Sequence, residues 1–200
     1  MSAPTIGVLA LQGDFAEHAA VMRRMGVETA EVRLPAQLES VDGLIIPGGE
    51  STTIGKLATT FELMKPLKKF AKQKPVWGTC AGAIFLSNDT QRDQPLLKVM
   101  DITVERNAFG RQVDSFIIDL NIKGIPDPDQ PFRAVFIRAP LIAKVGKKVE
   151  VLAELPAGQQ REATIVAARQ GHLLATSFHP ELTDDDRVHR LFVEMVEEAR

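Results

Sequence analysis

Cysteine is nearly absent from this 200-residue sequence, which contains only Cys80. An intramolecular disulfide is therefore impossible, and a metal site made of several cysteines is excluded. By itself, a lone cysteine is usually a small buried hydrophobic residue, so its presence does not indicate a reactive thiol. Because disulfides belong to oxidising compartments, we expect a reducing, cytoplasmic location.

An excess of one charge and long apolar runs are also lacking. The formal net charge is −2, from 24 Lys and Arg residues against 26 Asp and Glu residues, so no basic surface indicates a nucleic-acid partner. No run of 18 or more apolar residues is present, which argues against a membrane-spanning helix. The first residues lack a basic stretch, so we expect no signal peptide. The apolar content of 44% is typical of a soluble globular chain.

Short apolar runs recur along the first part of the chain, and each has the length of a buried strand. The run Ile6–Leu11 has no polar alternation, which indicates a parallel strand buried on both faces. Segments with helical periodicity separate the runs, so their order predicts a parallel sheet with helices on both faces. The expected strands lie at 6–11, 27–34, 44–46 and 75–77.

Capping and helix-breaking residues indicate where the helices begin and end. Asp14 can cap a first helix, which Gly26 would end. A second helical segment runs from Ser51 to about Lys72, and Pro66 is expected to break it into two pieces. A further helix is expected to start within 83–88.

The middle of the chain differs, because turn-like stretches rather than helices separate its apolar segments. We expect antiparallel strands there, which extend or flank the main sheet. A last strand at 172–178 precedes a helix that Thr183 would cap. The predicted fold class is therefore α/β, a flavodoxin-like three-layer fold with a mainly parallel central sheet, helices on both faces and additional antiparallel strands in the middle of the chain. Those strands are expected at 102–106, 115–122, 134–137, 149–155 and 164–168, and the apolar stripe of the last helix at Leu191, Phe192, Met195 and Val196.

The segment Gly78–Gly82 (GTCAG) lies where a predicted strand meets a predicted helix. Small residues on both sides of Cys80 permit the tight strand-to-helix turn that exposes a nucleophile. A thiol at a helix N-terminus also lies at the positive end of the helix dipole, which favours the thiolate. A cysteine that merely packs in a glycine-rich turn is the alternative interpretation.

The segment Ser177–Glu181 (SFHPE) offers the base that a cysteine nucleophile needs. His179 follows the last predicted strand, so its ring can lie at the same carboxyl edge of the sheet as Cys80. Glu181 lies two residues on and can accept a hydrogen bond from the imidazole. A surface turn is the alternative for this short pattern. The other histidines are weaker candidates: we expect His18 and His189 to be solvated on helices, and His172 to lie in a turn.

The segment Pro47–Thr53 (PGGESTT) also follows a strand and opens a helix. Consecutive glycines allow backbone N–H groups to point into a cavity, as a phosphate-binding loop or an oxyanion hole requires. The sequence contains neither GxxxxGK[ST] nor GxGxxG, so a nucleotide site is poorly supported.

Together these segments resemble the class I (triad-type) glutamine amidotransferases, and more narrowly the glutaminase subunits of pyridoxal 5′-phosphate synthases. The resemblance runs from Ile6 to the last helix, so we expect residues 1–200 to form a single glutamine amidotransferase domain. The motifs that carry it are Pro47–Thr53, Gly78–Gly82, Glu105–Gln112, Phe136–Pro140 and Ser177–Glu181.

The resemblance implies a role for each matching residue. Cys80 would attack the carboxamide carbon of glutamine and form a thioester, His179 would transfer the proton, and Glu181 would orient the imidazole. Ammonia and L-glutamate would be the products. The oxyanion hole would be formed by backbone N–H groups of Gly48 or Gly49 and of Ala81. Glutamine would be bound by Gly49, Glu50, Ser51, Arg106, Ile137 and Arg138.

The resemblance also implies a hetero-oligomeric partner. Ammonia would pass through a tunnel to a (β/α)₈-barrel synthase that makes pyridoxal 5′-phosphate (vitamin B6), and the isolated chain would be nearly inactive. Gln12, in the loop after the first strand, would contact that partner. The family usually has an apolar or small residue where Asp14 stands. We expect no cofactor, metal, nucleotide, nucleic acid or membrane to be bound.

Three other functions remain open from the residues alone. A redox sensor or deglycase would also carry a cysteine on such an elbow, but it requires neither the His-Pro-Glu nor the Pro-Gly-Gly-Glu-Ser segment. A degenerate amidotransferase would bind glutamine without hydrolysing it, although all three triad residues are present. An esterase of the hydrolase fold has its acid before the histidine, whereas here the acid follows.

Overall fold

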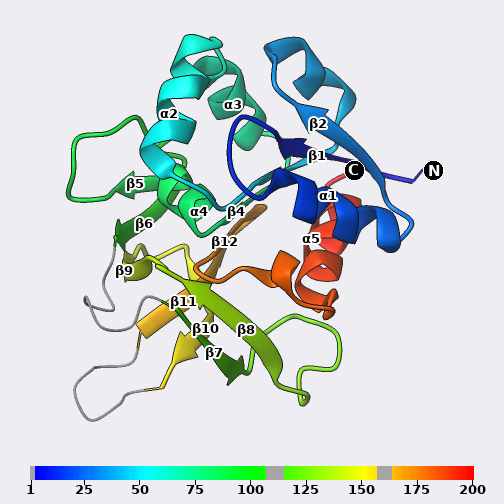
Figure 1. Cartoon of the computed structure of the whole chain (residues 1–200), viewed down its shortest axis with the longest axis vertical. Coiled ribbons are helices and arrows are strands. Elements are labelled where there is room, and N and C mark those ends of the chain that lie inside the picture. Colours follow the sequence, from blue (N-terminus) through cyan, green and yellow to red (C-terminus); the bar gives the residue numbers. More distant parts are fainter. Residues whose placement is uncertain (1–2, 107–114, 157–163) are drawn as a thin grey trace.

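The computed structural model describes residues 3–106, 115–156 and 164–200 (Figure 1). The first part of the chain forms β1 (Thr5–Leu9), α1 (Phe15–Arg24), β2 (Glu28–Val32), the 3-10 helix η1 (Pro35–Ser40), β3 (Gly43–Ile46), α2 (Ser51–Thr60), α3 (Met64–Ala71), β4 (Val76–Thr79) and α4 (Ala81–Leu86). The remainder forms β5 (Ser87–Asp89), β6 (Met100–Glu105), β7 (Ser115–Leu120), β8 (Phe132–Ile137), β9 (Leu141–Val145), β10 (Glu150–Leu155), β11 (Thr164–Gln170), β12 (Leu173–Thr176), the 3-10 helix η2 (Pro180–Leu182) and α5 (Arg187–Glu198).

The main sheet has the strand order β2-β1-β3-β4-β12-β11-β9-β6-β5, and β10 pairs with β11. The strands from β2 to β12 are parallel. Beyond β12 the pairs β12–β11, β11–β9 and β9–β6 are antiparallel. Strands β7 and β8 form a separate antiparallel pair. The predicted α/β fold, with a mainly parallel sheet and antiparallel strands from the middle of the chain, is therefore confirmed.

Two apolar clusters lie on opposite faces of the sheet, because successive strand residues point to opposite sides. In β3, Leu44 and Ile46 belong to one cluster and Ile45 to the other. The first cluster takes in residues of α2, α3 and α4, and the second takes in residues of α1, α5, β7 and β8. Figure 1 shows α1 and α5 side by side, and they cover the face opposite to α2, α3 and α4. The predicted core stripe of the last helix is confirmed, since Leu191, Phe192, Met195 and Val196 are buried.

Several predicted boundaries are wrong. The break between α2 and α3 falls before Met64, and Pro66 lies in the first turn of α3, where its missing N–H needs no partner. Helix α4 begins at Ala81, and residues 87–89 form β5 instead of continuing the helix. Thr183 does not cap α5, which begins at Arg187; its hydroxyl donates to the Pro180 carbonyl at 3.0 Å.

Strand β9 was not predicted from the sequence. Only Ile142 of this strand is fully buried, so the segment lacks the apolar pattern that identified the other strands. Its conformation depends on pairing with β6 and β11, which are distant in sequence. Among the described helices, none has the length and apolar character to cross a bilayer.

Candidate active site

The loops that follow β1, β3, β4 and β12 meet at one edge of the sheet, as expected for the carboxyl ends of parallel strands. The Asp14 N–H donates to the Gly48 carbonyl at 3.1 Å, which joins the first two loops. The Cys80 N–H donates to the Thr176 carbonyl at 2.8 Å, which joins the last two. A Cβ placed on Gly48 would lie 2.5 Å from Cε1 of His179, so only glycine fits beside that ring.

Cys80 occupies a strained turn between β4 and α4, with φ 47° and ψ −105°. A non-glycine residue with positive φ is uncommon and marks a conformation held by its surroundings. A Cβ on Gly82 would lie 2.0 Å from the Ile46 carbonyl oxygen, and one on Gly78 would lie 2.5 Å from the Gly82 backbone. These two glycines therefore allow the backbone to pass close enough for the tight turn that the sequence predicted. The side chain of Cys80 is almost fully buried.

His179 contacts both other residues of the predicted triad. Its Nδ1 lies 2.6 Å from Oε1 of Glu181, and its interaction with the Cys80 side chain raises the pKa of the ring. Since the Glu181 carboxylate engages Nδ1, we assign the Cys80 contact to Nε2. The backbone N–H of His179 donates to the Val135 carbonyl at 2.8 Å, which ties this loop to β8. The fold therefore brings together the side chains of Cys80, His179 and Glu181, as the sequence analysis expected.

The surroundings of His179 favour its cationic form. Burial lowers the pKa of its imidazole, but hydrogen bonds to Asp14, Cys80 and Glu181 outweigh burial and raise the pKa to about 12. Burial raises the pKa of Glu181 against the lowering effect of His179. An imidazolium is also what His179 would become if it took the thiol proton, so these hydrogen bonds would stabilise the product of such a transfer.

Asp14 is a second carboxylate on the same imidazole. Its Oδ2 lies 3.4 Å from Nδ1 of His179, and its hydrogen bond to His179 lowers the pKa of Asp14. The prediction that Asp14 caps α1 is wrong, because its side chain makes no capping hydrogen bond and faces the cation of His179 instead. The sequence signal that could have revealed this position of Asp14 is an acidic residue directly after the Gln12–Gly13 pair, in a loop at the same sheet edge as Cys80 and His179.

The prediction that His18 and His189 are solvated is also wrong. Both are fully buried, with 3.0 Å between Nδ1 of His18 and Nε2 of His189. The helical spacing could have predicted their burial. Met22 lies four residues after His18, and Phe192 lies three residues after His189, so each histidine is on the apolar face of its helix. His172 lies in the turn before β12, with Nε2 2.8 Å from the Ala71 carbonyl.

A second group of predicted residues gathers at the start of α2. Glu50 accepts from the Thr53 N–H at 2.8 Å and caps this helix, and its Oε1 pairs with Nη2 of Arg106 at 2.7 Å. Burial would raise the pKa of Glu50, but hydrogen bonds from Thr52, Thr53 and Arg106 lower it to about 2. Glu50 is therefore an anion at neutral pH.

Gln94, which the sequence analysis did not single out, connects this group. Its Oε1 accepts from Nη1 of Arg106 at 3.1 Å, and its Nε2 donates to the Ser51 hydroxyl at 3.2 Å. Three predicted glutamine-binding residues, Glu50, Ser51 and Arg106, thus form one polar network with Gln94. Only the start of the predicted motif 105–112 lies within the described residues.

The remaining predicted residues occupy different positions. Ile137 and Arg138 are exposed at the end of β8, and among the described residues no hydrogen bond or ion pair joins them to the Glu50–Arg106 pair. Gln12 folds onto the Gly48–Gly49 loop, where its Oε1 accepts from the Glu50 N–H at 2.7 Å. Gly49 is exposed with φ 146°, and Ala81 is buried at the start of α4, directly after Cys80.

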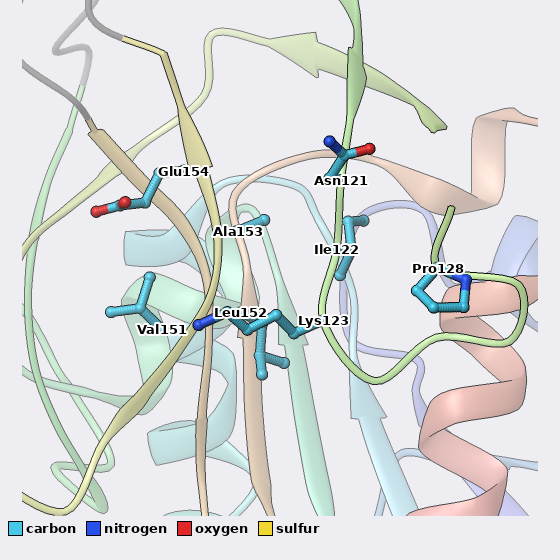
Figure 2. A pocket seen from close by; sticks show the side chains of 8 residues that line it. All are labelled: Asn121, Ile122, Lys123, Pro128, Val151, Leu152, Ala153 and Glu154. Carbon is cyan, nitrogen blue, oxygen red and sulfur yellow. The ribbon is translucent and has the colours of Figure 1, made fainter. Parts of the chain in front are cut away.

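Ligand atoms of Asp14, His179 and Glu181 lie within 4.8 Å of one another, which is close enough for a metal ion. The same Nδ1 already contacts both carboxylates, so the group is accounted for by its internal hydrogen bonds. A separate surface hollow of about 350 Å³ lies between β10 and the segment after β7 (Figure 2). It shares no residue with the Cys80 site and offers neither a thiol nor a histidine: its walls are Asn121, Ile122, Lys123, Pro128, Val151, Leu152, Ala153 and Glu154.

Comparisons with known proteins agree with this geometry. The sequence profile of the SNO glutamine amidotransferase family matches residues 8–198. "Pyridoxal 5′-phosphate synthase subunit PdxT" of Chloroflexus aurantiacus is 55% identical over 196 residues, which cover 96% of this chain and 100% of that protein. The protein of that name from Nocardioides sp. is 54% identical over 203 residues, which cover 100% of this chain and 99% of the relative.

Solved structures are similar as well. One described as a glutamine amidotransferase is 48% identical with a TM-score of 0.88, and the match covers 96% of this chain and 98% of that one. A putative GMP synthase component from Thermoplasma acidophilum is 17% identical with a TM-score of 0.68, covering 99% of this chain and 96% of that one. At this low identity the second likeness bears on the fold alone.

Proposed function

The chain belongs to the SNO glutamine amidotransferase family, and from that membership we propose that it is the glutaminase subunit of a pyridoxal 5′-phosphate synthase. It would hydrolyse L-glutamine to L-glutamate and ammonia for vitamin B6 synthesis. The names of relatives that match it over nearly their whole length support this role. The match to residues 8–198 supports one glutamine amidotransferase domain over residues 1–200.

The observation that carries the chemistry is the contact of Cys80, His179 and Glu181 at one sheet edge. In the proposed mechanism, His179 takes the thiol proton and the Cys80 sulfur attacks the carboxamide carbon of glutamine. The resulting oxyanion is stabilised by backbone N–H groups of Gly48 or Gly49 and of Ala81.

Collapse of this tetrahedral intermediate breaks the carbon–nitrogen bond and leaves a thioester on Cys80. The proton on His179 goes to the departing nitrogen, so ammonia leaves as a neutral molecule. His179 then takes a proton from water, and the hydroxide attacks the thioester carbonyl. The second tetrahedral intermediate releases L-glutamate and returns the proton to the Cys80 sulfur.

The polar network at α2 supplies groups of the right charge for the amino-acid end of glutamine. A zwitterion needs a cation for its carboxylate and an anion for its ammonium group. Arg106 or the exposed Arg138 would meet the carboxylate, and Glu50 would meet the ammonium group. Ser51, Gly49 and Ile137 would complete the site.

Ammonia protonates in water and then loses its nucleophilicity, which favours direct transfer to a synthase subunit. We propose a (β/α)₈-barrel partner, with Gln12 at the contact and the Gly48–Gly49 loop beneath it. Gln12 accepts a hydrogen bond from the Glu50 N–H. A partner that docks on Gln12 would therefore also affect the adjacent Gly48–Gly49 backbone, which carries the proposed oxyanion donors. The chain would use no cofactor or metal of its own.

Covalent labelling tests the proposed nucleophile. A glutamine analogue with a chloromethyl ketone in place of the carboxamide should alkylate Cys80 of the chain in complex with the synthase subunit, and excess L-glutamine should protect it. Mass spectrometry of peptides would locate the label, with the Cys80→Ala variant as control. Labelling that L-glutamine does not slow, or labelling of the Cys80→Ala variant at another residue at the same rate, would contradict the proposal.

A further inference from the structure

A buried chain of imidazoles lies behind the triad acid. His18 of α1 has Nε2 3.3 Å from Oε2 of Glu181 and 3.1 Å from the Thr79 hydroxyl, and its Nδ1 is 3.0 Å from Nε2 of His189 of α5. Both histidines are 0% exposed. The Trp77 ring contacts both imidazoles edge-on, with centroid distances of 5.5 Å to His18 and 4.9 Å to His189. Packing therefore fixes both rings.

The two oxygens of Glu181 have different partners. Oε1 lies on His179, whereas Oε2 is buried and makes no well-aligned hydrogen bond among the described residues. Nε2 of His18 lies within ion-pair distance of Oε2, at 3.3 Å. A buried carboxylate oxygen without a donor is costly, so a donor at this position decides where the carboxylate rests.

The proton positions in this chain of imidazoles follow from one nitrogen that has no hydrogen-bond partner. Nδ1 of His189 is buried and has no hydrogen-bond partner in the described structure. A neutral imidazole carries one N–H, and a buried donor without an acceptor is unfavourable, so we assign the proton of His189 to Nε2. It then donates to Nδ1 of His18, which places the His18 proton on Nε2, facing Oε2 of Glu181 and Thr79. The opposite assignment would set a bare nitrogen of His18 against a carboxylate oxygen.

Both imidazoles are kept neutral. Burial holds the pKa of His18 well below its usual value, and His189 and His179 lower it further. Burial lowers the pKa of His189 to about 3; Asp186 opposes this shift and Arg24 adds to it. A neutral N–H orients the Glu181 carboxylate without cancelling its charge, so that charge stays available to the imidazolium of His179.

We propose that His18, supported by His189, is a positioning residue of the Cys80–His179–Glu181 triad: its Nε2–H, shared with the Thr79 hydroxyl, faces Oε2 of Glu181 at 3.3 Å and thereby keeps Oε1 on Nδ1 of His179. This inference rests on the proposed function. His18 touches neither the thiol nor the amide, so it acts only through Glu181, and it ties α1 and α5 to the reaction.

Two substitutions at one position test the proposal in the complex with the synthase subunit. His18→Leu removes the donor, and His18→Gln places an amide N–H where Nε2 stands. We expect His18→Leu to lower kcat for L-glutamine roughly 10-fold with KM unchanged, since the N–H that faces the charged Oε2 of Glu181 is lost. His18→Gln should recover most of kcat. His172→Leu is the matched control, because His172 also loses one hydrogen bond, to Ala71, but lies outside the chain of imidazoles.

Thermal unfolding separates positioning from folding. A His18→Leu variant with a normal unfolding temperature and normal kcat would overturn the proposal. Equal losses in His18→Leu, His18→Gln and His172→Leu would also overturn it, because they would indicate a structural effect alone. Wild-type protein that releases no ammonia with its partner would contradict the proposed function instead, so the two failures are distinguishable.

The proton positions have a spectroscopic signature that does not depend on activity. The chain has four histidines, so ¹⁵N-histidine NMR can resolve each ring. We expect His18 and His189 to show the neutral Nε2–H tautomer throughout about pH 5 to 8, the range in which free histidine titrates. A proton on Nδ1 of His18, or titration of His18 within this range, would overturn the assignment and the proposal with it.

Discussion

Replacing Glu181 by glutamine keeps the shape of the side chain and removes its charge, 2.6 Å from Nδ1 of His179. A hydrogen bond to a charged group contributes about 1.5–3 kcal/mol, and each 1.36 kcal/mol corresponds to a tenfold change in rate, so kcat should fall roughly 10- to 150-fold. KM for L-glutamine should change little, because Glu181 is buried behind the imidazole. Steady-state ammonia release in the complex with the synthase subunit measures both constants.

Asp14 should moderate this loss. Its carboxylate lies at 3.4 Å from the same nitrogen and is partly exposed, so it replaces only part of the missing charge. We expect Asp14→Asn alone to lower kcat less than Glu181→Gln, and the double variant to lose more than the product of the two single losses. Full activity of Glu181→Gln together with full activity of the double variant would refute the reasoning that a carboxylate on His179 is needed.

Three further predictions concern the elbow, the polar network and the buried imidazoles. Gly82→Ala should lower the free energy of unfolding by roughly 2–4 kcal/mol in a denaturant titration, since its Cβ would meet the Ile46 carbonyl at 2.0 Å. Gly26→Ala is the control, because its Cβ would meet nothing within 4 Å; it should lower the free energy of unfolding by only about 1–2 kcal/mol, owing to its positive φ. Arg106→Lys should raise KM for L-glutamine at least about tenfold with a smaller change in kcat, because a lysine cannot bridge a carboxylate and an amide as the guanidinium does; an unchanged KM would contradict this role. Burial lowers the pKa of His189 to about 3, so below about pH 6.5 the unfolded chain binds a proton that the folded chain does not, and stability falls as pH drops from 6.5 towards 3. His189→Gln should therefore flatten the dependence of the unfolding temperature on pH over this range. An unchanged slope would count against this prediction.

The sequence predicted that Cys80 and His179 would meet because each lies in a segment that follows a buried strand, and the resemblance then assigned them, with Glu181, to a triad. Carboxyl ends of parallel strands share one edge, so the order of apolar runs was enough to bring Cys80 and His179 together. The same reasoning could not place Asp14, because a short acid before a helix has the pattern of a cap. In the fold its backbone N–H donates to the Gly48 carbonyl, and this contact turns the side chain towards His179.

The polar residues behind the triad were missed for a different reason. His18 and His189 lie on amphipathic helices, and a histidine near the edge of an apolar stripe is ambiguous until the facing helix is known. Their burial depends on α1 and α5 lying side by side on Trp77, a contact between residues far apart in the chain. Gln94 was missed because one of its partners, Ser51, lies 43 residues earlier in the chain, and β9 was missed because it is held by pairing with β6 and β11.

The most direct test of the central claim is ammonia release from L-glutamine by the purified chain, with and without a pyridoxal 5′-phosphate synthase subunit. The account predicts release that rises strongly when this partner is added and that is abolished by Cys80→Ala. His172→Leu, which lies outside the triad, should retain the partner-dependent rate. Ammonia release that persists in Cys80→Ala with the partner present would contradict the account.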